Sequence, residues 1–384
     1  MKKIVMIAAM KYSKSDGISK KICMQASGLS SDGNKGNLFC LGENGIVKLE
    51  YDNGVLVGEN LIASFSSKDE GIGGINEERD LLRVSMKFLN EHDVDMLYVR
   101  HMLPDMSLLQ LLRIAHNKKI KIGYEIPTYP YYREQMNVSK NKLKTFVKLG
   151  IETVYWPLIY KNIDVLTVIR CSTKAKMFKK MLSITNGFAG GFQEYIPSDL
   201  NNINMIGVGT IYTYHGYEKV IRNMEKCGCR TSDGALINFH IVGQSGEIDR
   251  LKNIVRQLEL EDHVFFHGVK HGEELKEIYR ECNLGVGTMA LSLRNADIDT
   301  AIKNIEYWSM NLPVMSSGSI FEVNENTGLY YKQNEKNSID FDSLSMFIQE
   351  FYMDSNKLNT IANVLDGFTW FAIMHYVVAK LKEE

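Results

Sequence analysis

Lys303 and Glu306 stand three residues apart in the stretch DIDTAIKNIEYWSMNLPV, residues 297–314, and this spacing could serve chemistry. On a helix, side chains three apart lie on the same face. The simplest interpretation is a surface ion pair, which contributes roughly 0.2–0.5 kcal/mol. The alternative is that both groups act on one ligand. The spacing alone favours the ion pair, and the rest of the sequence is needed to distinguish the two interpretations.

Three Asp-x-Asp patterns could in principle hold a divalent metal. They are DVD at 93–95, DID at 297–299 and DFD at 340–342. Carboxylate oxygens suit hard cations, but three matches in one chain show how unspecific the pattern is, and no metal site is predicted. The six cysteines are scattered, and no second pair completes a zinc set around Cys227 and Cys229. Reduced thiols are therefore expected.

Two turns after predicted strands could approach a phosphate. GVGT at 207–210 contains Gly-x-Gly, but the third glycine and the acidic residue of a dinucleotide fingerprint are missing. We interpret it as a tight turn that leads into a helix. His215 directly precedes Gly216 and a predicted helix start, where a hydrogen-bond donor could meet a phosphate. The alternative for His215 is an ordinary hydrogen-bonded side chain.

Composition limits the classes of protein to which this sequence can belong. Its 384 residues suffice for two domains, and the net charge of −1 argues against a nucleic-acid-binding protein. No run reaches the roughly 18 apolar residues that span a membrane. The apolar run at 3–9 is too short for a signal peptide and is expected to form a buried strand. A cytoplasmic protein is predicted.

Short apolar runs alternate with helical patterns, which predicts parallel sheets covered by helices. The first series has strands at 3–9, 94–100, 120–126 and 163–169, and helices from near Gly17, at 106–119 and at 172–182. The alternation restarts after residue 195, which indicates two doubly wound α/β domains joined near 186–202. Such sheets bind ligands at the carboxyl ends of their strands. A cleft between the domains is expected to hold a nucleotide or a sugar phosphate.

A basic segment lies in the first half of the chain. From Arg113 to Lys180 there are fifteen lysines and arginines against four acidic residues. Between 139 and 163, lysines are mixed with Phe, Tyr, Trp and Leu. One interpretation is a solvated helix face. The other is docking to an anionic membrane surface, where each basic residue adds roughly 1 kcal/mol.

The second half of the chain resembles a known family. Its segments, in order, are GVGTIYTYHGYEKVI, then FHIVGQSGEIDRLKNIVRQLELEDHVFFHGVKHGEELKEIYRECNLGVGTMALSLRN, then IKNIEYWSMNLPV, over most of residues 203–318. This order resembles the donor domain of retaining glycosyltransferases of family 4, most of all the bacterial polysaccharide-cluster members. YEIPTYPYYRE at 124–134 is similar to a segment of the same subgroup. The resemblance implies the GT-B fold, in which two Rossmann-like domains face a cleft.

The resemblance also implies roles for the two domains. Residues 1–195, with a final helix at about 368–384 that crosses back, would bind the acceptor, and residues 196–367 would bind the nucleotide-sugar donor. Glu306 would accept hydrogen bonds from the ribose hydroxyls of the donor, and Lys303 would meet its diphosphate. The other donor-binding candidates implied by the resemblance are His215, Gly216, Thr210, Gly17 and Asp299.

Catalysis is expected from Lys303, Arg294 and Glu125. The two cations would stabilise the leaving diphosphate, and Glu125 lies about where many relatives carry a histidine near the reacting sugar. The chain departs from the family at Ile298, where relatives have a glutamate that touches the donor sugar. It also departs at Thr210 and His215, which fall on the positions of an arginine and a lysine.

The resemblance therefore implies a glycosyltransferase that acts with retention of configuration and without metal or cofactor. The donor would be a UDP- or GDP-sugar that supplies a hexosyl or N-acetylhexosaminyl group. The acceptor would be a polysaccharide, a lipid-linked glycan or another acceptor, at the inner face of the plasma membrane. Two alternatives stay open: a catalytically silent subunit that binds and stabilises a partner transferase, and a nucleotide-sugar epimerase.

Overall fold

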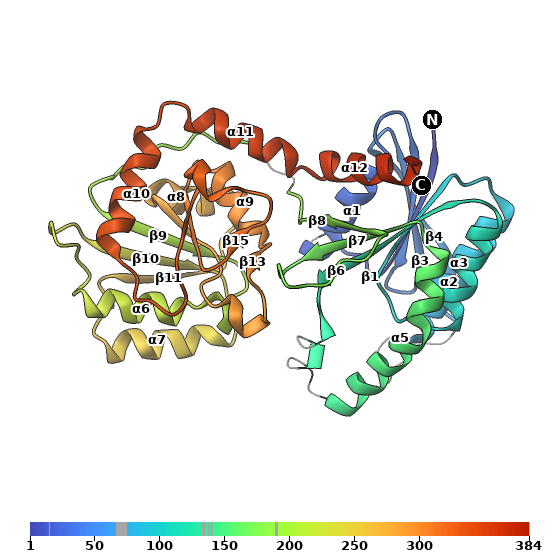
Figure 1. Ribbon diagram of the computed structural model, residues 1–384, viewed down its shortest axis with the longest axis horizontal. Helices are drawn as coiled ribbons and strands as arrows, with labels where there is room; N and C mark the ends of the chain where they lie inside the picture. Colours follow the sequence, from blue (N-terminus) through green and yellow to red (C-terminus); the bar gives the residue numbers. More distant parts are fainter. Residues whose placement is uncertain are drawn as a thin grey trace. The chain divides into compact units, whose positions relative to one another are not determined.

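The computed structural model describes residues 1–14, 16–66, 75–132, 135–136, 139, 141–188 and 191–383. The chain divides into two compact units (Figure 1). The N-terminal unit comprises Met1–Arg170, Lys174–Ala189 and Thr369–Glu384, and the C-terminal unit comprises Cys171–Thr173 and Gly190–Phe368. The last helix of the chain thus belongs to the first unit. From the sequence, the boundary between the domains was placed between residues 195 and 196.

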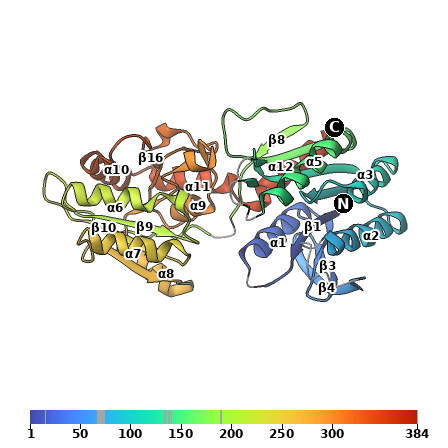
Figure 2. The same cartoon turned by 90° about the horizontal axis from the view of Figure 1, so that it is seen from below.

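An eight-stranded sheet with the order β4-β3-β2-β1-β5-β6-β7-β8 forms the centre of the N-terminal unit. Its strands are β1 (Lys3–Lys11), β2 (Lys35–Leu41), β3 (Gly45–Asp52), β4 (Val55–Ser64), β5 (Met96–Arg100), β6 (Lys121–Tyr129), β7 (Val165–Arg170) and β8 (Met181–Ile184). Neighbouring strands are parallel except around β3, which is antiparallel to β2 and β4. Figure 2 shows β3 and β4 at one side of this unit. The strand order reverses between β1 and β5.

Helices cover both faces of this sheet. Helices α2 (Ile75–Glu91), α3 (Met106–Asn117) and α5 (Lys142–Asn162) lie on one face, and α1 (Gly17–Leu29) and α12 (Trp370–Glu383) lie on the other. Strand β1 serves both layers, because Val5 and Ile7 pack in the first core and Ile4 and Met6 in the second. This alternation is what a strand buried on both faces requires.

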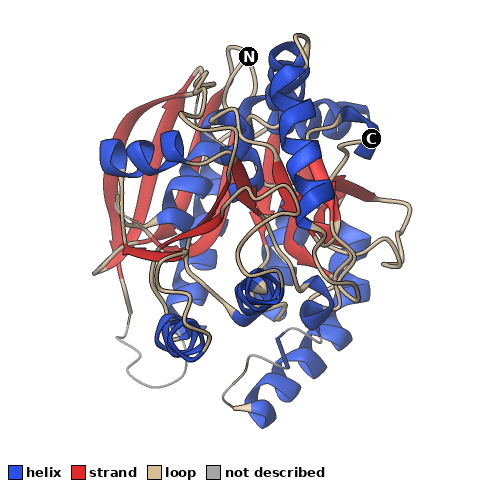
Figure 3. Ribbon diagram, turned by 90° about the vertical axis from the view of Figure 1, so that its left-hand side faces the viewer, coloured by secondary structure: helices blue, strands red, loops and turns tan. Residues whose placement is uncertain are grey.

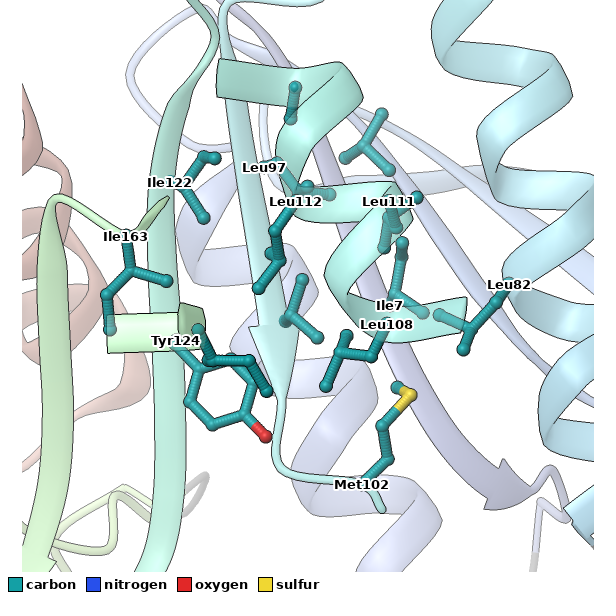
Figure 4. Close-up of a cluster of buried hydrophobic side chains, with 14 of the residues drawn as sticks. Ile7, Leu82, Leu97, Met102, Leu108, Leu111, Leu112, Ile122, Tyr124 and Ile163 are labelled. Carbon is teal, nitrogen blue, oxygen red and sulfur yellow. The ribbon is translucent and has the colours of Figure 1, made fainter. Parts of the chain in front are cut away.

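The larger core of the N-terminal unit lies between the sheet and α3. Figure 4 shows Leu97 of β5 and Ile122 of β6 close to Leu112 of α3. All three side chains are fully buried. Apolar residues at i, i+3 and i+4 of α3 face the sheet, as an amphipathic helix requires.

A six-stranded parallel sheet with the order β11-β10-β9-β12-β14-β16 forms the centre of the C-terminal unit. Its strands are β9 (Ile203–Val208), β10 (Ile237–Val242), β11 (Val264–Gly268), β12 (Leu284–Val286), β14 (Val314–Ser316) and β16 (Tyr330–Lys332), and a separate small ladder joins β13 (Ile298–Asp299) to β15 (Ser319–Ile320). The strand order reverses between β9 and β12. In a doubly wound sheet, ligands bind outside the carboxyl ends of the strands at such a switch point.

Helices and short 3-10 turns connect these strands. They are α6 (Tyr217–Lys226), α7 (Glu247–Gln257), α8 (Gly272–Glu281), α9 (Ile302–Ser309), α10 (Phe341–Met353) and α11 (Lys357–Gly367), with η1 (Thr213–His215), η2 (Leu291–Arg294) and η3 (Glu325–Thr327). Figure 3 shows the strands in red and the helices around them in blue. The two doubly wound domains predicted from the sequence are therefore confirmed.

One predicted helix is wrong, and a group of three strands was not predicted. Residues 172–182 do not form a helix, and Met181–Ile184 is instead β8, which pairs with β7. In a helix, Lys176 and Lys180 would place like charges four residues apart, which is unfavourable. The antiparallel strands β2 to β4 had no counterpart in the sequence analysis.

All six cysteines are free thiols. Among the described residues, no helix combines the length and the apolar character needed to cross a bilayer.

We expect the contact between α1 and α12 to be sensitive to a single methyl group. A Cβ at Gly28 of α1 would lie 2.5 Å from the carbonyl oxygen of Trp370, so Gly28→Ala should destabilise the protein by about 1–3 kcal/mol. Gly150, inside α5, has no atom within 4 Å of its Cβ position. Gly150→Ala should be neutral or stabilising by up to about 1 kcal/mol. Urea unfolding measures both, and equal effects would contradict the close contact.

Candidate functional site

Two loops meet at the switch point of the C-terminal sheet. One follows β9 and contains η1, and the other follows β12 and contains η2. The N–H of Met289 donates to the carbonyl of His215 (3.0 Å), and the N–H of Ala290 donates to the carbonyl of Tyr214 (3.1 Å). Gly216 has a φ of 67°, and a Cβ there would lie 2.9 Å from Met289. Only glycine fits this position, which fixes the loops against each other.

His215 is held as a neutral hydrogen-bond donor. Its Nδ1 accepts the backbone N–H of Tyr212 at 3.3 Å, so the proton of the neutral ring lies on Nε2. Burial lowers the pKa of His215 to about 2, and the nearby charges of Lys303 and Arg294 act in the same direction. No group in the described part of the chain bonds to Nε2. This N–H is therefore available to an anionic ligand.

Lys303 is an ammonium group buried at the same loops. Its Nζ donates to the carbonyl of Gly287 (2.9 Å) and to the hydroxyl of Tyr217 (3.2 Å), and it lies 5.2 Å from the centroid of the Tyr217 ring. Burial lowers its pKa to about 8, although Asp299 partly offsets this. An ammonium group has three N–H donors, so one stays available after these two bonds.

Asp299 has a structural role, because its side chain is buried among protein groups. Its carboxylate is buried and accepts from the N–H of Thr288 (2.9 Å), the hydroxyl of Ser316 (2.8 Å) and the N–H of Ala301 (3.1 Å). The last bond satisfies a free N–H at the start of α9. Asp299 therefore joins the loop after β12, the end of β14 and α9, which carries Lys303. A direct donor contact by Asp299 stays a prediction.

The other aspartate of this Asp-x-Asp pattern is also engaged. Asp297 accepts from the N–H of Thr173 at 2.6 Å and from its hydroxyl at 2.5 Å. In the described residues, no group of three His, Cys, Asp or Glu side chains is arranged to hold a metal ion.

Glu306 lies on the exposed side of α9. The structure shows no ion pair between Lys303 and Glu306, because the Lys303 side chain runs inward to Gly287 while Glu306 is exposed. Within the described ranges, no residue bonds to the Glu306 carboxylate. The ion-pair interpretation of the three-residue spacing is therefore wrong, and Glu306 keeps both oxygens available as acceptors.

Arg294 and Thr210 lie in the same two loops, Arg294 in η2 and Thr210 just after β9. The Arg294 guanidinium lies 4.7 Å from the centroid of the Tyr214 ring, which is a cation–π contact. Thr210 is exposed and directly follows Gly209. The structure thus brings together His215, Lys303 and Arg294, which the sequence analysis had proposed as contacts of one diphosphate.

Two candidates lie in the N-terminal unit. Gly17 begins α1, and Asp16 caps this helix by accepting the N–H of Ser19 at 2.8 Å. A phosphate at this helix start would meet the negative charge of Asp16, which is unfavourable. The contact of Gly17 with the donor stays a prediction.

Glu125 of β6 is fully buried in a polar cluster. Its Oε2 accepts from Nε2 of Gln25 (2.7 Å) and the hydroxyl of Tyr98 (2.8 Å), and its Oε1 lies 3.4 Å from Nε of Arg100. Burial lowers the pKa of nearby Lys21 to about 8, which Glu125 partly offsets. In this arrangement Glu125 forms an ion pair with Arg100 and interacts electrostatically with Lys21, and its contact with a sugar stays a prediction.

Sequence reasoning missed the residues that hold the predicted ones in place. Tyr217 and Ser316 supply hydroxyl groups to Lys303 and Asp299. The sequence could have pointed to Tyr217, because this aromatic residue begins the helix directly after Gly216 and its ring must enter the core. It could not have pointed to Ser316, since a serine at the end of a buried strand is ordinary.

Comparison with known proteins identifies the C-terminal unit. Residues 194–336 match a family described as glycosyl transferases group 1. Among curated proteins, none gives a significant match to the sequence.

Solved structures of similar fold cover the whole chain. Sucrose-phosphate synthase from Thermosynechococcus elongatus is 13% identical, with a TM-score of 0.60 over 100% of this chain and 99% of that chain. The lipopolysaccharide outer core galactosyltransferase WaaB is 12% identical, with a TM-score of 0.58 over 100% and 99%. WaaG, a glycosyltransferase involved in lipopolysaccharide biosynthesis, is 10% identical, with a TM-score of 0.55 over 99% and 100%. The chain therefore has the GT-B fold.

The pKa of Lys303 leads to a prediction about nucleotide binding. The group is charged below pH 8 and becomes neutral above it, so an anion that contacts it is bound more weakly as pH rises. We expect the affinity for UDP to fall between pH 7.5 and 9.5, by up to about tenfold for each pH unit. The phosphate itself titrates near pH 6, below this range. Isothermal titration calorimetry across the range measures the effect.

Lys303→Gln should bind UDP more weakly and lose this pH dependence. Lys226→Gln, at the exposed end of α6, is the matched control and should keep the affinity and the pH profile of the wild type. A wild-type affinity that is constant over the range would contradict a contact between Lys303 and the diphosphate.

Proposed function

We propose that this protein transfers a hexosyl or N-acetylhexosaminyl group from a UDP- or GDP-sugar to a glycan or lipid-linked acceptor, with retention of configuration and without metal or cofactor. The C-terminal unit binds the donor, and the N-terminal unit binds the acceptor. The observation that carries the proposal is the convergence of Lys303, Arg294 and the Nε2–H of His215 at the switch point of the C-terminal sheet.

These three groups suit the charge that develops in the reaction. When the bond between the sugar and the diphosphate breaks, negative charge accumulates on the diphosphate. Lys303 is fixed by Gly287 and Tyr217, and His215 is fixed by Tyr212. Donors that are already oriented need no rearrangement as the charge forms, so they stabilise the transition state more than the bound donor.

Glu306 supports recognition of the nucleotide. A carboxylate with both oxygens free can accept hydrogen bonds from two adjacent ribose hydroxyls. Its position one turn after Lys303 on α9 would place the ribose next to the diphosphate. Ile298 is buried, so the contact with the sugar that relatives make at this position would have to come from another residue.

A catalytically silent subunit is the second candidate. It is favoured by the small number of cations at the switch point, since Thr210 and His215 stand where relatives of family 4 carry an arginine and a lysine. In that case the partner would be an active transferase.

Donor hydrolysis by the purified protein tests the proposal. We expect one member of a panel of nucleotide sugars to be hydrolysed slowly, because water can replace the acceptor. The released sugar should keep the anomeric configuration of the donor by NMR, and the rate should be unchanged in EDTA. Glu306→Ala should weaken nucleotide binding at least about tenfold, because each lost hydrogen bond to a charged group is worth about 1.5–3 kcal/mol.

Glu277→Ala is the matched control, since Glu277 is an exposed glutamate on α8, and its nucleotide affinity should equal that of the wild type. If no nucleotide binds at millimolar concentration and the protein co-purifies with another transferase, the silent subunit is the correct function. Loss of hydrolysis in EDTA with recovery on addition of Mn²⁺ would overturn the metal-independent mechanism.

Helix α5 supports a second part of the proposal, that the protein acts at the inner face of the plasma membrane. Its lysines Lys142, Lys144 and Lys148 are exposed, and none of them forms an ion pair with a described residue. Leu143, Phe146, Val147 and Val154 are exposed on the same helix, by 75%, 68%, 52% and 71%. Apolar side chains that enter the headgroup layer beside lysines that meet anionic lipid are typical of interfacial helices. Lys140, also expected to contribute, lies outside the described residues.

We expect the protein to bind vesicles that contain phosphatidylglycerol and not vesicles of phosphatidylcholine alone. The attraction is electrostatic, so 1 M salt should weaken it as the screening length falls from about 10 Å to about 3 Å. Changing Lys142, Lys144 and Lys148 to Glu should abolish co-flotation. The same charge change at Lys174, Lys176 and Lys179, which lie outside α5, should have little effect. If both triple variants weaken binding equally, α5 is not the docking surface.

A further inference from the structure

The N-terminal unit contains a cavity of about 470 Å³ beside α5. This volume lies within the range of small-ligand sites. Its lining residues come from the end of β5, from β6 and the segment after it, and from α5: His101, Ile126, Pro127, Thr128, Tyr131, Gln135, Ser139, Thr145 and Lys148.

The inner wall of the cavity is mostly apolar. Tyr131 and His101 lie with their ring centroids 5.2 Å apart, next to Ile126 and Pro127. Both nitrogens of His101 are turned toward the protein, because Nδ1 bonds to the hydroxyl of Tyr124 (3.0 Å) and the buried Nε2 lies 3.8 Å from Glu152. His101 therefore lines the cavity with ring carbons, as a surface for stacking rather than for hydrogen bonding.

Polar groups gather where α5 borders the cavity. Thr145 and Ser139 share a hydrogen bond of 2.6 Å between their hydroxyl oxygens, and one hydroxyl proton of the pair stays free to donate. Lys148 is exposed, and no residue of the described chain forms an ion pair with it. The acidic residue nearest along α5, Glu152, is buried, which raises its pKa to about 7 and reduces its negative charge. Glu78 of α2 also interacts with Lys148, but burial raises the pKa of this carboxyl group. Lys148 therefore brings a positive charge to one side of the cavity, which Glu78 partly offsets.

The outer side of the same helix has a different character. Leu143 precedes Thr145 by two residues, and Phe146 and Val147 lie between Thr145 and Lys148. These three apolar side chains are more than half exposed. A ligand held by Lys148 and Thr145 would thus lie next to an apolar surface. An amphiphile matches an apolar cavity, a cation at its edge and an exposed apolar helix beside it.

We propose that this cavity binds the phosphate-bearing headgroup of a membrane lipid, and that this lipid carries the acceptor. The phosphate contacts Lys148 and the hydroxyl pair of Thr145 and Ser139. The remainder of the headgroup packs on Tyr131 and Ile126, and the hydrocarbon chain stays in the bilayer beside Phe146. The assignment of this lipid as acceptor rests on the proposed transferase function, whereas the binding of the headgroup does not.

Short-chain lipids that stay monomeric test the cavity without a membrane surface. Dihexanoyl phosphatidic acid should bind saturably in calorimetry, and dihexanoyl phosphatidylcholine and inorganic phosphate should bind at least tenfold more weakly. Lys148→Gln should lower the affinity for dihexanoyl phosphatidic acid at least tenfold. Lys161→Gln, an exposed lysine at the other end of α5, is the matched control and should change it less than twofold.

Thr145→Phe fills the cavity and provides a second test that leaves Lys148 in place. It should abolish binding of dihexanoyl phosphatidic acid while donor hydrolysis, measured in the same preparation, shows that the protein is folded. Binding by Thr145→Phe equal to that of the wild type, or equal losses in Lys148→Gln and Lys161→Gln, would overturn the proposal. Equal affinity for inorganic phosphate would show a site for free phosphate instead. Saturable lipid binding without donor hydrolysis would contradict the transferase function and leave the lipid site intact.

Discussion

The burial of one ammonium group at the switch point is the constraint on which the C-terminal unit depends. A buried charge costs several kcal/mol unless hydrogen bonds and an opposite charge compensate it. Gly287 and Tyr217 provide the bonds and Asp299 provides the charge. Because Tyr217 must reach Lys303, its ring passes β9, where a Cβ at Gly207 would lie 2.5 Å from its hydroxyl oxygen. The Gly-x-Gly turn that resembles part of a nucleotide fingerprint is therefore required by packing around a lysine, and only its exposed end, at Gly209 and Thr210, faces solvent.

The three-residue spacing of Lys303 and Glu306 shows what a sequence can and cannot establish about a site. The spacing correctly placed both residues on α9, yet it gave no information about the direction of each side chain. That direction depends on Gly287, sixteen residues away, whose carbonyl draws the ammonium group inward. The alternation of strands and helices was predictable in both units because it depends on local apolar patterns. Residues 172–182 were not, since β8 forms only through pairing with β7, and pairing across a sheet leaves no local pattern.

Carboxylates were the least predictable part of the site. Asp299 and Glu125 were both expected to contact ligand, and both are buried with their oxygens bonded to protein groups. The sequence gives the residue type, but the role of a carboxylate depends on which donors the fold brings to it. In both units the buried acid stabilises a nearby cation, Lys303 in one case and Lys21 in the other, and burial still lowers the pKa of each lysine to about 8. Each lysine thus loses its charge at a lower pH than an ordinary lysine, and an anionic ligand would strengthen the preference for the charged form.

Helix α5 reverses the usual arrangement of a surface helix, because an acidic side chain is buried and apolar side chains are exposed. Its one acidic residue near the cavity, Glu152, is buried without a hydrogen-bond partner, while Phe146 and Val154 are exposed. In Figure 1, one end of α5 extends beyond the sheet, so that end gains little from the core of its own unit. An apolar environment outside the protein would stabilise it by about 25 cal/mol for each Å² that it covers. Because Thr145 and Lys148 border the cavity from the same turns of α5, an environment that covered the outer face would lie directly beside the cavity. Attachment to a membrane and selection of a lipid headgroup would then be one event rather than two.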